Sequence, residues 1–310
     1  LEYGQAYFWR VDEVNAAPDN TIFKGDVWSF TVEPLAYPIE GITATSNGSS
    51  EAGVGPENMV NGSGLNASDQ HSTESTDMWL AVAGADPITI EYAFDGVYKL
   101  HEMLVWNYNV QVELLLGFGI KNVTVEYSED GATWMSLGDV ELAQATAKAD
   151  YTANTAVDMG GVAAQYVRLT VNSGFSMIGQ YGLSEVRFLS VPVLAREPQP
   201  ANGAADVSID AALGWRSGRE AVSHEVSLGT DPEALALADT TTATSSAPAA
   251  LDLATTYYWK VDEVNEAEAI PVWEGHVWSF ATQDYLVVDD FEGYNDEDNV
   301  IYETWIDGWV

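Results

Sequence analysis

The stretch VTVEYSEDGATWMSLG, residues 123–138, decides the fold class of the largest part of this 310-residue chain. Its first six residues alternate between apolar and polar side chains, as a half-buried β-strand requires, and EDG at 129–131 is a turn signal. Four more runs rich in β-forming residues lie at 88–94, 103–108, 166–171 and 185–188. No amphipathic helical pattern of ordinary length accompanies them. Residues 35–191 are therefore predicted to form an all-β sandwich.

The composition excludes several classes of partner and chemistry. Eleven Lys and Arg against 48 Asp and Glu give a formal net charge of −37. This charge repels a phosphate backbone and an anionic membrane surface, so we expect no nucleic-acid partner. No stretch approaches about 18 consecutive apolar residues, so we expect no membrane insertion. Hydrophobic residues still make up 46% of the chain, which supplies packed cores. The absence of Cys excludes disulfides, thiolate metal sites and a Cys nucleophile.

An internal repeat marks further modules. YFWRVDEVNAAPDNTIFKGDVWSFT at 7–31 and YYWKVDEVNEAEAIPVWEGHVWSFA at 257–281 are identical at 13 of 25 positions, with a constant spacing of 250. YxWxV alternates like a strand and VWSF is a second β-rich run, so each copy is predicted to be a β-hairpin. Such self-similarity indicates two copies of one structural unit. The shared aromatic and acidic positions, from Tyr to Glu, are interpreted as core packing plus a solvated turn, with a binding role for the Trp residues as the alternative.

The second copy closes a region at 195–283, which starts with the Pro/Gly/Ala linker AREPQPANGA. Two β-like runs, 207–215 and 222–228, precede the hairpin, while the Ala-rich segment 232–239 is at most one short helix. Short strands at this spacing predict a β-sandwich. The region resembles the fibronectin type III-like modules of large bacterial secreted proteins. Trp215 and three segments carry that resemblance: SHEVSLGTDPEAL at 223–235, TYYWKVDEVN at 256–265 and VWSF at 277–280.

Both ends of the chain are predicted to hold partial β modules. Residues 1–33 contain only the last hairpin of a fibronectin type III-like module. Residues 284–310 resemble the start of a further jelly-roll-like β-sandwich module. We expect a fragment of a longer, multi-module protein. The alternative is a self-associating subunit whose incomplete sandwiches are completed by copies of itself or by neighbouring modules, as in donor-strand complementation.

The middle domain, 35–191, resembles the coagulation factor 5/8 type C (discoidin) domain and the related family 32 carbohydrate-binding modules. The motifs that carry the resemblance are ITATS at 42–46, GPENMVNGSG at 55–64, LVWNYN at 104–109, the stretch at 123–138, AAQYVRLTV at 163–171 and GLSEVRF at 182–188. The resemblance implies a discoidin-like jelly-roll β-sandwich that is not an enzyme. Members bind glycans, or in some branches lipids or collagen, through loops at one end.

The resemblance also implies one structural Ca²⁺. The family pattern P-x-N-A-x-D-G becomes PENMVNG at 56–62, so Asn61 stands where the family has Asp. Ca²⁺ takes about six to eight oxygen ligands from carboxylates, carbonyls and hydroxyls. The alternative is a set of turn-forming residues without metal. The predicted ligands are Asn58, Asn61, Ser63, Asp69, Ser184 and Glu185.

Three segments resemble the ligand-side loops of the family: 69–76, 106–111 and 172–181. Aromatic faces can stack on the apolar face of a sugar, and polar side chains then bind its hydroxyls. His71, within DQHST, is expected to be exposed. For Trp106, packing in the core and stacking on a sugar are equally weighted alternatives. The predicted ligand-binding residues are His71, Trp106, Asn107, Tyr108, Asn109, Phe175, Gln180 and Tyr181.

No GxSxG, HExxH or P-loop motif occurs in the sequence, and its four His are scattered. The predicted function is therefore a non-catalytic carbohydrate-binding or adhesion region, located outside the cell or on its surface, with a glycan or glycosylated surface as partner. One alternative is a structural subunit of an extracellular filament or surface layer, assembled through incomplete β modules. Another is an accessory region of a secreted carbohydrate-active enzyme.

Overall fold

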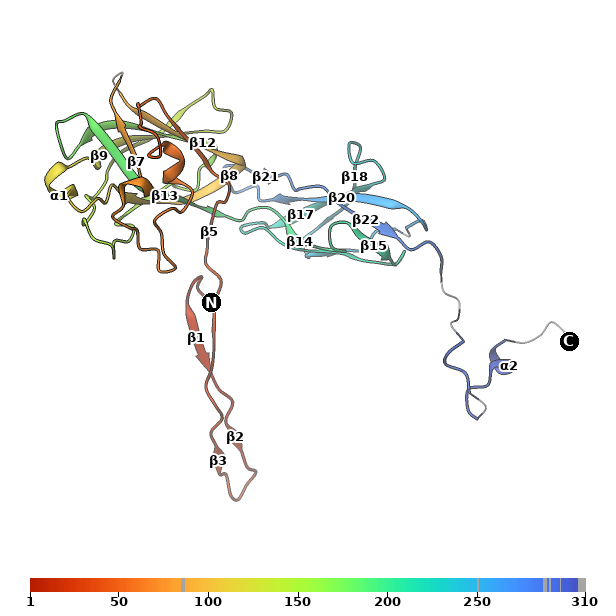
Figure 1. Ribbon diagram of the computed structural model, residues 1–310. Helices are drawn as coiled ribbons and strands as arrows, with labels where there is room; N and C mark the ends of the chain where they lie inside the picture. The colour runs from red at the N-terminus through yellow and green to blue at the C-terminus, as the bar shows by residue number, and fades with distance from the viewer. Residues whose placement is uncertain (85–86, 250, 287–288, 290, 296, 306–310) are drawn as a thin grey trace. The chain divides into compact units, whose positions relative to one another are not determined.

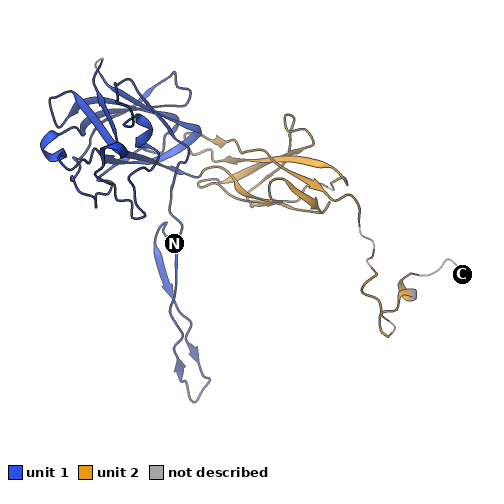
Figure 2. Cartoon of the chain, in the orientation of Figure 1, with its two compact units in different colours: residues 1–192 blue, residues 193–310 orange. Residues whose placement is uncertain are grey.

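The computed structural model describes residues 1–84, 87–249, 251–286, 289, 291–295 and 297–305 (Figure 1). The chain divides into two compact units, Leu1–Pro192 and Val193–Val310 (Figure 2). Strands form nearly all of the regular structure, which confirms the all-β prediction. Within the described part of the chain, no helix has the length and apolar character needed to cross a lipid bilayer.

The main sheet system of unit 1 follows the order β10-β9-β12-β8-β13-β5, with β6 and β11 also paired to β8 and β7 paired to β13. The strands are β5 (Tyr37–Pro38), β6 (Thr43–Ser46), β7 (Trp79–Val82), β8 (Thr89–Asn107), β9 (Ile120–Ser128), β10 (Met135–Glu141), β11 (Thr155–Asp158), β12 (Ala163–Gly174) and β13 (Gln180–Val191). Short helical turns lie between them: η1 (Pro56–Met59), η2 (Ser75–Asp77) and α1 (Glu113–Leu116).

Strand β8 organises this domain. The runs predicted at 88–94 and 103–108 are parts of one 19-residue strand. Its first half pairs with β12 and β6, and its second half pairs with β11 and β13. Tyr92 from the first half and Met103 from the second half belong to one core. Phe188 of β13, which pairs with Met103, lies 5.2 Å from Tyr92, ring centroid to ring centroid. The long strand thus couples the two halves of the sandwich.

The alternation in residues 123–138 works as predicted. Val123 and Val125 are fully buried in the core, and they pair through β9 with β12 and β10. Glu126, the residue after Val125 in β9, points to the face opposite the core and forms an ion pair of 3.0 Å with Arg168. The side-chain period of two therefore separates core from surface along β9.

Unit 2 contains a three-stranded and a six-stranded sheet. The first is β14 (Arg196–Gln199), β16 (Leu213–Arg216) and β19 (Ser245–Ser246); the second is β15 (Ala204–Val207), β22 (Trp278–Thr282), β20 (Thr256–Val264), β17 (Ser223–Gly229) and β18 (Ala236–Thr241), with β21 (Val272–Trp273) on β20. Trp215, Trp259, Trp278 and Phe280 contribute to the core of this unit.

Residues 232–239, for which at most one short helix was predicted, contain no helix. The Ala-rich segment leads into strand β18, which pairs antiparallel with β17. Ala favours helices in isolation, but a strand edge offers backbone donors and acceptors that an isolated segment lacks. Here the edge of β17 decides the conformation.

The predicted hairpin at 7–31 forms β1 (Ala6–Trp9), β2 (Glu13–Val14), β3 (Ile22–Phe23) and β4 (Trp28–Thr31). β1 pairs with β4 and β2 with β3. The second copy has the same hairpin in β20, β21 and β22. The two copies differ in burial: Trp259 is fully buried, whereas its counterpart Trp9 is 50% exposed.

The β pattern expected at 284–310 does not form in the described part of that segment. Its described residues make turns and the short helix α2 (Ile301–Thr304), and 306–310 lie outside the described residues. A strand needs a neighbour for its backbone N–H and C=O groups. Apolar residues there, such as Phe291 at 5.4 Å from Trp305, pack on one another instead.

Replacing Trp259 by Ala is expected to lower the free energy of unfolding of unit 2 by about 3–5 kcal/mol, because it opens a cavity in a packed core. The matched change Trp9→Ala removes a half-exposed ring, so we expect a change below about 1 kcal/mol in this chain. Urea unfolding followed by circular dichroism measures both. Equal losses in the two variants would contradict the difference in burial.

Candidate functional site

Asn107 closes strand β8 and is fully buried. Its side-chain amide donates to the carbonyl oxygens of Ile120 (2.7 Å) and Ala143 (2.9 Å). Its side-chain oxygen accepts from the backbone N–H groups of Tyr108 (2.9 Å) and Ile120 (3.1 Å). Every hydrogen-bonding position of this amide is used within the protein. Asn107 therefore holds the loops and has no free atom for a ligand, contrary to its predicted binding role.

A covering loop, defined as residues 142–154, lies over the neighbouring predicted residues. Asn109 is fully buried and its amide donates to the carbonyl oxygens of Ser72 (3.0 Å) and Lys148 (2.7 Å). The backbone N–H of His71 donates to the Tyr151 carbonyl (2.7 Å). Residues of this loop thus form hydrogen bonds with the polar groups that the sequence predicted to bind a ligand.

The expectation that His71 is exposed was wrong. The side chain is fully buried, and its Nδ1 lies 3.1 Å from the Ser72 carbonyl oxygen. Desolvation lowers the pKa of His71, so the neutral ring is favoured at pH 7. Its Nε2 and the side-chain oxygen of Asn109 are buried and find no partner among the described residues. DQHST is polar as a sequence, but the covering loop encloses it.

The two aromatic residues of LVWNYN are core residues. Trp106 is 2% exposed; it packs with Tyr151, and its indole N–H donates to the Asp69 carbonyl (3.0 Å). Tyr108 is also 2% exposed and lies so close to Gly182 that a Cβ there would be 2.5 Å from its ring. Of the two readings for Trp106, core packing is the one that the structure supports, and neither ring offers a face to a sugar.

The remaining predicted residues, Phe175, Gln180 and Tyr181, are half-buried and reach solvent. They flank the turn between β12 and β13. The ring of Tyr181 lies over Gly174, since a Cβ there would be 3.0 Å from Tyr Cε1. The backbone N–H of Phe175 donates to the Gly119 carbonyl (3.2 Å), which ties this turn to the segment after α1.

Exposed apolar side chains occur on the same turn and on the neighbouring α1. Gly117, which ends α1, is so close to the Phe175 backbone that a Cβ would lie 3.0 Å from it. The turn and α1 are therefore neighbours, at the α1 end of the domain (Figure 1). We call this region the loop-end surface, and it comprises Leu114, Leu115, Phe175, Met177, Ile178, Gln180 and Tyr181.

The predicted calcium ligands near η1 form a compact set. The amide nitrogen of Asn58 donates to the carbonyl oxygens of Gly53 (3.1 Å), Thr76 (3.0 Å) and Met78 (3.1 Å). The side-chain oxygen of Asn61 accepts from the Ser63 backbone N–H (2.8 Å). Asn58 therefore acts here as a donor that fixes the loop, and Asn61 as a turn-forming residue.

Glu185 provides the carboxylate. It is 5% exposed, its carboxylate is close enough to the Gly62 backbone N–H for that group to affect its pKa, and its Oε2 has no partner among the described residues. Burial raises the pKa of Glu185 to about 8, although the Gly62 N–H and the nearby Arg187 charge oppose the shift. A buried carboxylate oxygen without a donor, beside the 61–63 turn, fits the position of a cation.

Asp69 is engaged elsewhere. Its carboxylate forms an ion pair of 2.9 Å with Arg187, whose hydrogen bond lowers the pKa of Asp69. Ser184 is buried, and its hydroxyl donates to the Asn107 carbonyl oxygen (2.8 Å). Of the six predicted ligands, the structure brings Asn58, Asn61 and Ser63 together with Glu185, and it places Asp69 and Ser184 in other interactions.

The described residues contain no group of three or more His, Asp and Glu side chains that could hold a metal. A cation beside Glu185 would therefore depend on neutral oxygens from the 58–63 segment for the rest of its ligands. One carboxylate with neutral oxygens suits Ca²⁺ better than it suits softer metals, which prefer His and Cys.

Three further residues matter here and were not predicted. Tyr151 packs on Trp106, and its hydroxyl accepts from the Asn107 backbone N–H (2.8 Å). Asp77 accepts from the Ser72 hydroxyl (2.6 Å). Glu113 is fully buried, accepts from the Gly119 backbone N–H (2.9 Å), and has a pKa raised by burial. Of these three residues, Glu113 alone has a signal in the sequence, since its carboxylate lies within the apolar run VELLL at 112–116.

Residues 41–182 match the family model described as F5/8 type C domain. This confirms the resemblance predicted for the middle domain over those residues. No curated protein matches the chain in sequence.

Solved structures similar to the chain include three from Clostridium perfringens. A carbohydrate-binding module of family 32 from CpGH89, in complex with GalNAc-β-1,3-galactose, is 14% identical over 49% of this chain and 98% of its own length, with a TM-score of 0.37. The family 32 module of NanJ, in complex with galactose, is 11% identical over 50% and 98%, with a TM-score of 0.38. The family 89 glycoside hydrolase itself, in complex with GlcNAc-α-1,4-galactose, is 16% identical over 49% of this chain and 14% of its own length, with a TM-score of 0.35.

The raised pKa of Glu185 predicts a pH dependence in metal-free protein. Its folded pKa of about 8 exceeds the ordinary value of 4.5, so the protonated form stabilises the fold below about pH 4.5 and this contribution is lost as the pH rises through 8. In EDTA, the free energy of unfolding of unit 1 should fall by a few kcal/mol more between pH 5 and 8 in the natural chain than in Glu185→Gln, since one unit of pKa corresponds to about 1.4 kcal/mol.

Urea titrations at pH 5, 6, 7 and 8 measure this difference. Asp69→Asn, in an exposed ion pair, is the matched control and should keep the natural slope. Parallel curves for the natural chain and Glu185→Gln would contradict the burial of a titrating carboxyl.

Proposed function

We propose that residues 35–191 form a carbohydrate-binding module without catalytic activity. The observation that carries the proposal is the F5/8 type C match over 41–182, joined to a loop-end surface where aromatic rings and an amide reach solvent. Rings bind the apolar face of a sugar, and an amide supplies both a donor and an acceptor for hydroxyls. A neutral glycan is not repelled by the acidic chain.

The proposed contact surface is the loop-end surface, with Phe175 and Tyr181 as the stacking residues and Gln180 as the hydrogen-bonding residue. The buried set around Asn107 and His71 would act indirectly, by holding the loops in place. Galactose and GalNAc, the sugars named for the neighbouring modules, are suitable first probes.

The double change Phe175→Ala and Tyr181→Ala should weaken binding to a galactose- or GalNAc-bearing glycan at least about tenfold, because each ring contributes apolar contact area. Tyr166→Ala, a half-buried tyrosine earlier in β12, is the matched control and should bind like the natural chain. A glycan array followed by isothermal titration calorimetry measures both. Absence of glycan binding by the folded natural chain would overturn the proposal.

We also propose that Ca²⁺ binds beside Glu185. The support is the buried Oε2 without a partner and the neutral oxygens of the 58–63 segment close to Gly62. Bound Ca²⁺ would neutralise the carboxylate and fix this segment against β13. Asp69 is not part of the proposed site, because Arg187 already pairs with it.

Addition of Ca²⁺ to EDTA-treated protein should raise the melting temperature of unit 1, since a ligand present at about 100 times its Kd stabilises by about 2.7 kcal/mol. Glu185→Gln should lose this shift and Asp69→Asn should retain it. Differential scanning calorimetry with and without Ca²⁺ decides. A shift that survives in Glu185→Gln would place the cation elsewhere.

We further propose that the module works outside the cell or on its surface as part of an adhesive region, with unit 2 as a spacer. The arrangement of a β14-β16-β19 sheet and a larger sheet built on β17, β20 and β22 supports a fibronectin type III-like type for unit 2. The alternative settings are a filament or surface-layer subunit and an accessory region of a secreted carbohydrate-active enzyme. Electron microscopy of the purified chain would show ordered assemblies in the filament case.

A further inference from the structure

The two copies of the repeat have similar internal packing, although the interplanar angle of the Trp pair is 48° in the first copy and 62° in the second. The ring centroids of Trp9 and Trp28 lie 4.6 Å apart, and those of Trp259 and Trp278 lie 4.8 Å apart. The tyrosine–phenylalanine pairs stack at 5.8 and 5.7 Å, both with an interplanar angle of 23°. The local sequence therefore specifies one hairpin conformation in both places.

Their environments differ completely. Within the repeat, six residues of the second copy are buried: Trp259, Val261, Asp262, Glu263, Trp278 and Phe280. All six are identical in the first copy, at positions 250 residues earlier. There the four apolar ones are open to solvent: Trp9 50%, Val11 52%, Trp28 48% and Phe30 45% exposed, against 0%, 0%, 7% and 1% in the second copy.

The 12 positions at which the copies differ are all exposed or half-buried in the second copy. The first copy thus keeps every residue that the second copy needs for a core. A contiguous exposed apolar face of this kind marks an interaction surface. The first hairpin has the side chains of a sandwich core, but the described residues around it supply no core.

Unit 2 shows what covers such a hairpin. β17 pairs along β20 from Ser223 opposite Val264 to Gly229 opposite Tyr258. From the facing sheet, the ring of Trp215 lies 6.5 Å from that of Trp259. Leu213, Val226 and Leu251 complete the same core. In unit 1, β1 and β4 form a sheet of two strands.

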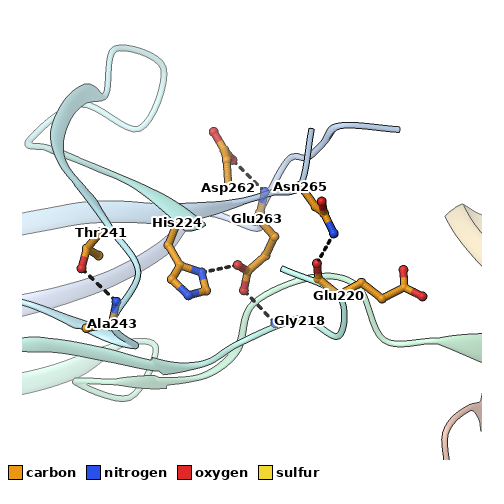
Figure 3. Close-up of polar contacts among 9 residues, drawn as sticks. Gly218, Glu220, His224, Thr241, Ala243, Asp262, Glu263 and Asn265 are labelled. Atoms are coloured by element: carbon orange, nitrogen blue, oxygen red, sulfur yellow. Dashed lines mark hydrogen bonds and ion pairs between the residues drawn. The ribbon is translucent and has the colours of Figure 1, made fainter. Parts of the chain in front are cut away.

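The polar contacts define the cover further. In unit 2 the buried Glu263 accepts from the Gly218 backbone N–H (2.7 Å) and pairs closely with Nδ1 of His224 (Figure 3). Its counterpart Glu13 is exposed. A body that buries Glu13 must therefore present a backbone N–H and a His or an equivalent donor at these two positions.

We propose that residues 1–33 dock into a β-sandwich body built like residues 193–254 of this chain but without a final hairpin of its own. In the complex a strand equivalent to β17 pairs with β1, and a Trp equivalent to Trp215 packs on Trp9. Glu13 then receives the His and backbone N–H that Glu263 has in unit 2. The first hairpin is thus the closing element of a separate sandwich.

A hairpin exchange tests whether the first copy can close such a body. In the full chain, residues 257–281 are replaced by the sequence of residues 7–31. We expect unit 2 to unfold cooperatively, with its inserted tryptophans shielded from acrylamide quenching as in the natural chain. The matched control carries the same insert with Trp9→Ser, Val11→Ser, Trp28→Ser and Phe30→Ser, and should lose the folded unit. If the two exchanged chains behave alike, the proposal is overturned.

A fusion tests the docking itself. A second copy of residues 193–254 replaces residues 1–4 of the full chain. Gln5 then follows the added segment as Thr255 follows residue 254 in unit 2, so the first hairpin is joined to the added body at the same position as the second hairpin. Amide hydrogen exchange in β1 and β4 should slow at least about 100-fold, and an additional unfolding transition should be seen. The matched control fusion carries Leu213→Ser and Trp215→Ser in the added copy and should leave β1 and β4 unprotected. Unchanged exchange in the unmodified fusion overturns the proposal, whether or not the added segment folds.

Discussion

The hydrogen bonds of Asn107 are the constraint on which the loop end of the middle domain depends. Besides the four bonds of its side chain, its backbone N–H donates to the Tyr151 hydroxyl and its carbonyl accepts from Ser184. One residue thereby joins the end of β8 to β9, β13 and the covering loop. Because it is fully buried, each of these bonds replaces one that water can no longer provide.

This constraint explains why the LVWNYN motif is structural in this chain. The motif ends the longest strand, and its polar side chains satisfy carbonyl groups of loops that would otherwise be buried without donors. Side chains that could bind the hydroxyl groups of a sugar can equally bind the backbone carbonyl groups of a loop. In this chain they bind the covering loop, and the surface that remains exposed for a ligand is the turn between β12 and β13.

The sequence predicted the fold from local patterns. Alternation along 123–128 and the spacing of motifs from 42 to 188 determine strands, sandwich and domain type, because side-chain period and turn chemistry are local properties. The site could be predicted only in part. Phe175, Gln180 and Tyr181 do reach solvent, whereas the burial of His71 depends on Tyr151, 80 residues later, in a loop without any motif. The pairing of Asp69 with Arg187 is equally long-range.

The repeat separates what local sequence determines from what it does not. Two copies with 13 identities in 25 positions adopt one hairpin, with ring-centroid distances of 4.6 and 4.8 Å in their Trp pairs, although one is in a core and the other is not. Conformation therefore follows from the hairpin itself, through its turn and its cross-strand aromatic pairs. Burial follows from strands that are far away in sequence. Large apolar side chains that are buried in one copy are exposed in the other copy, although the hairpin itself is formed in both. Their exposure therefore indicates a missing neighbour and not a misfolded segment.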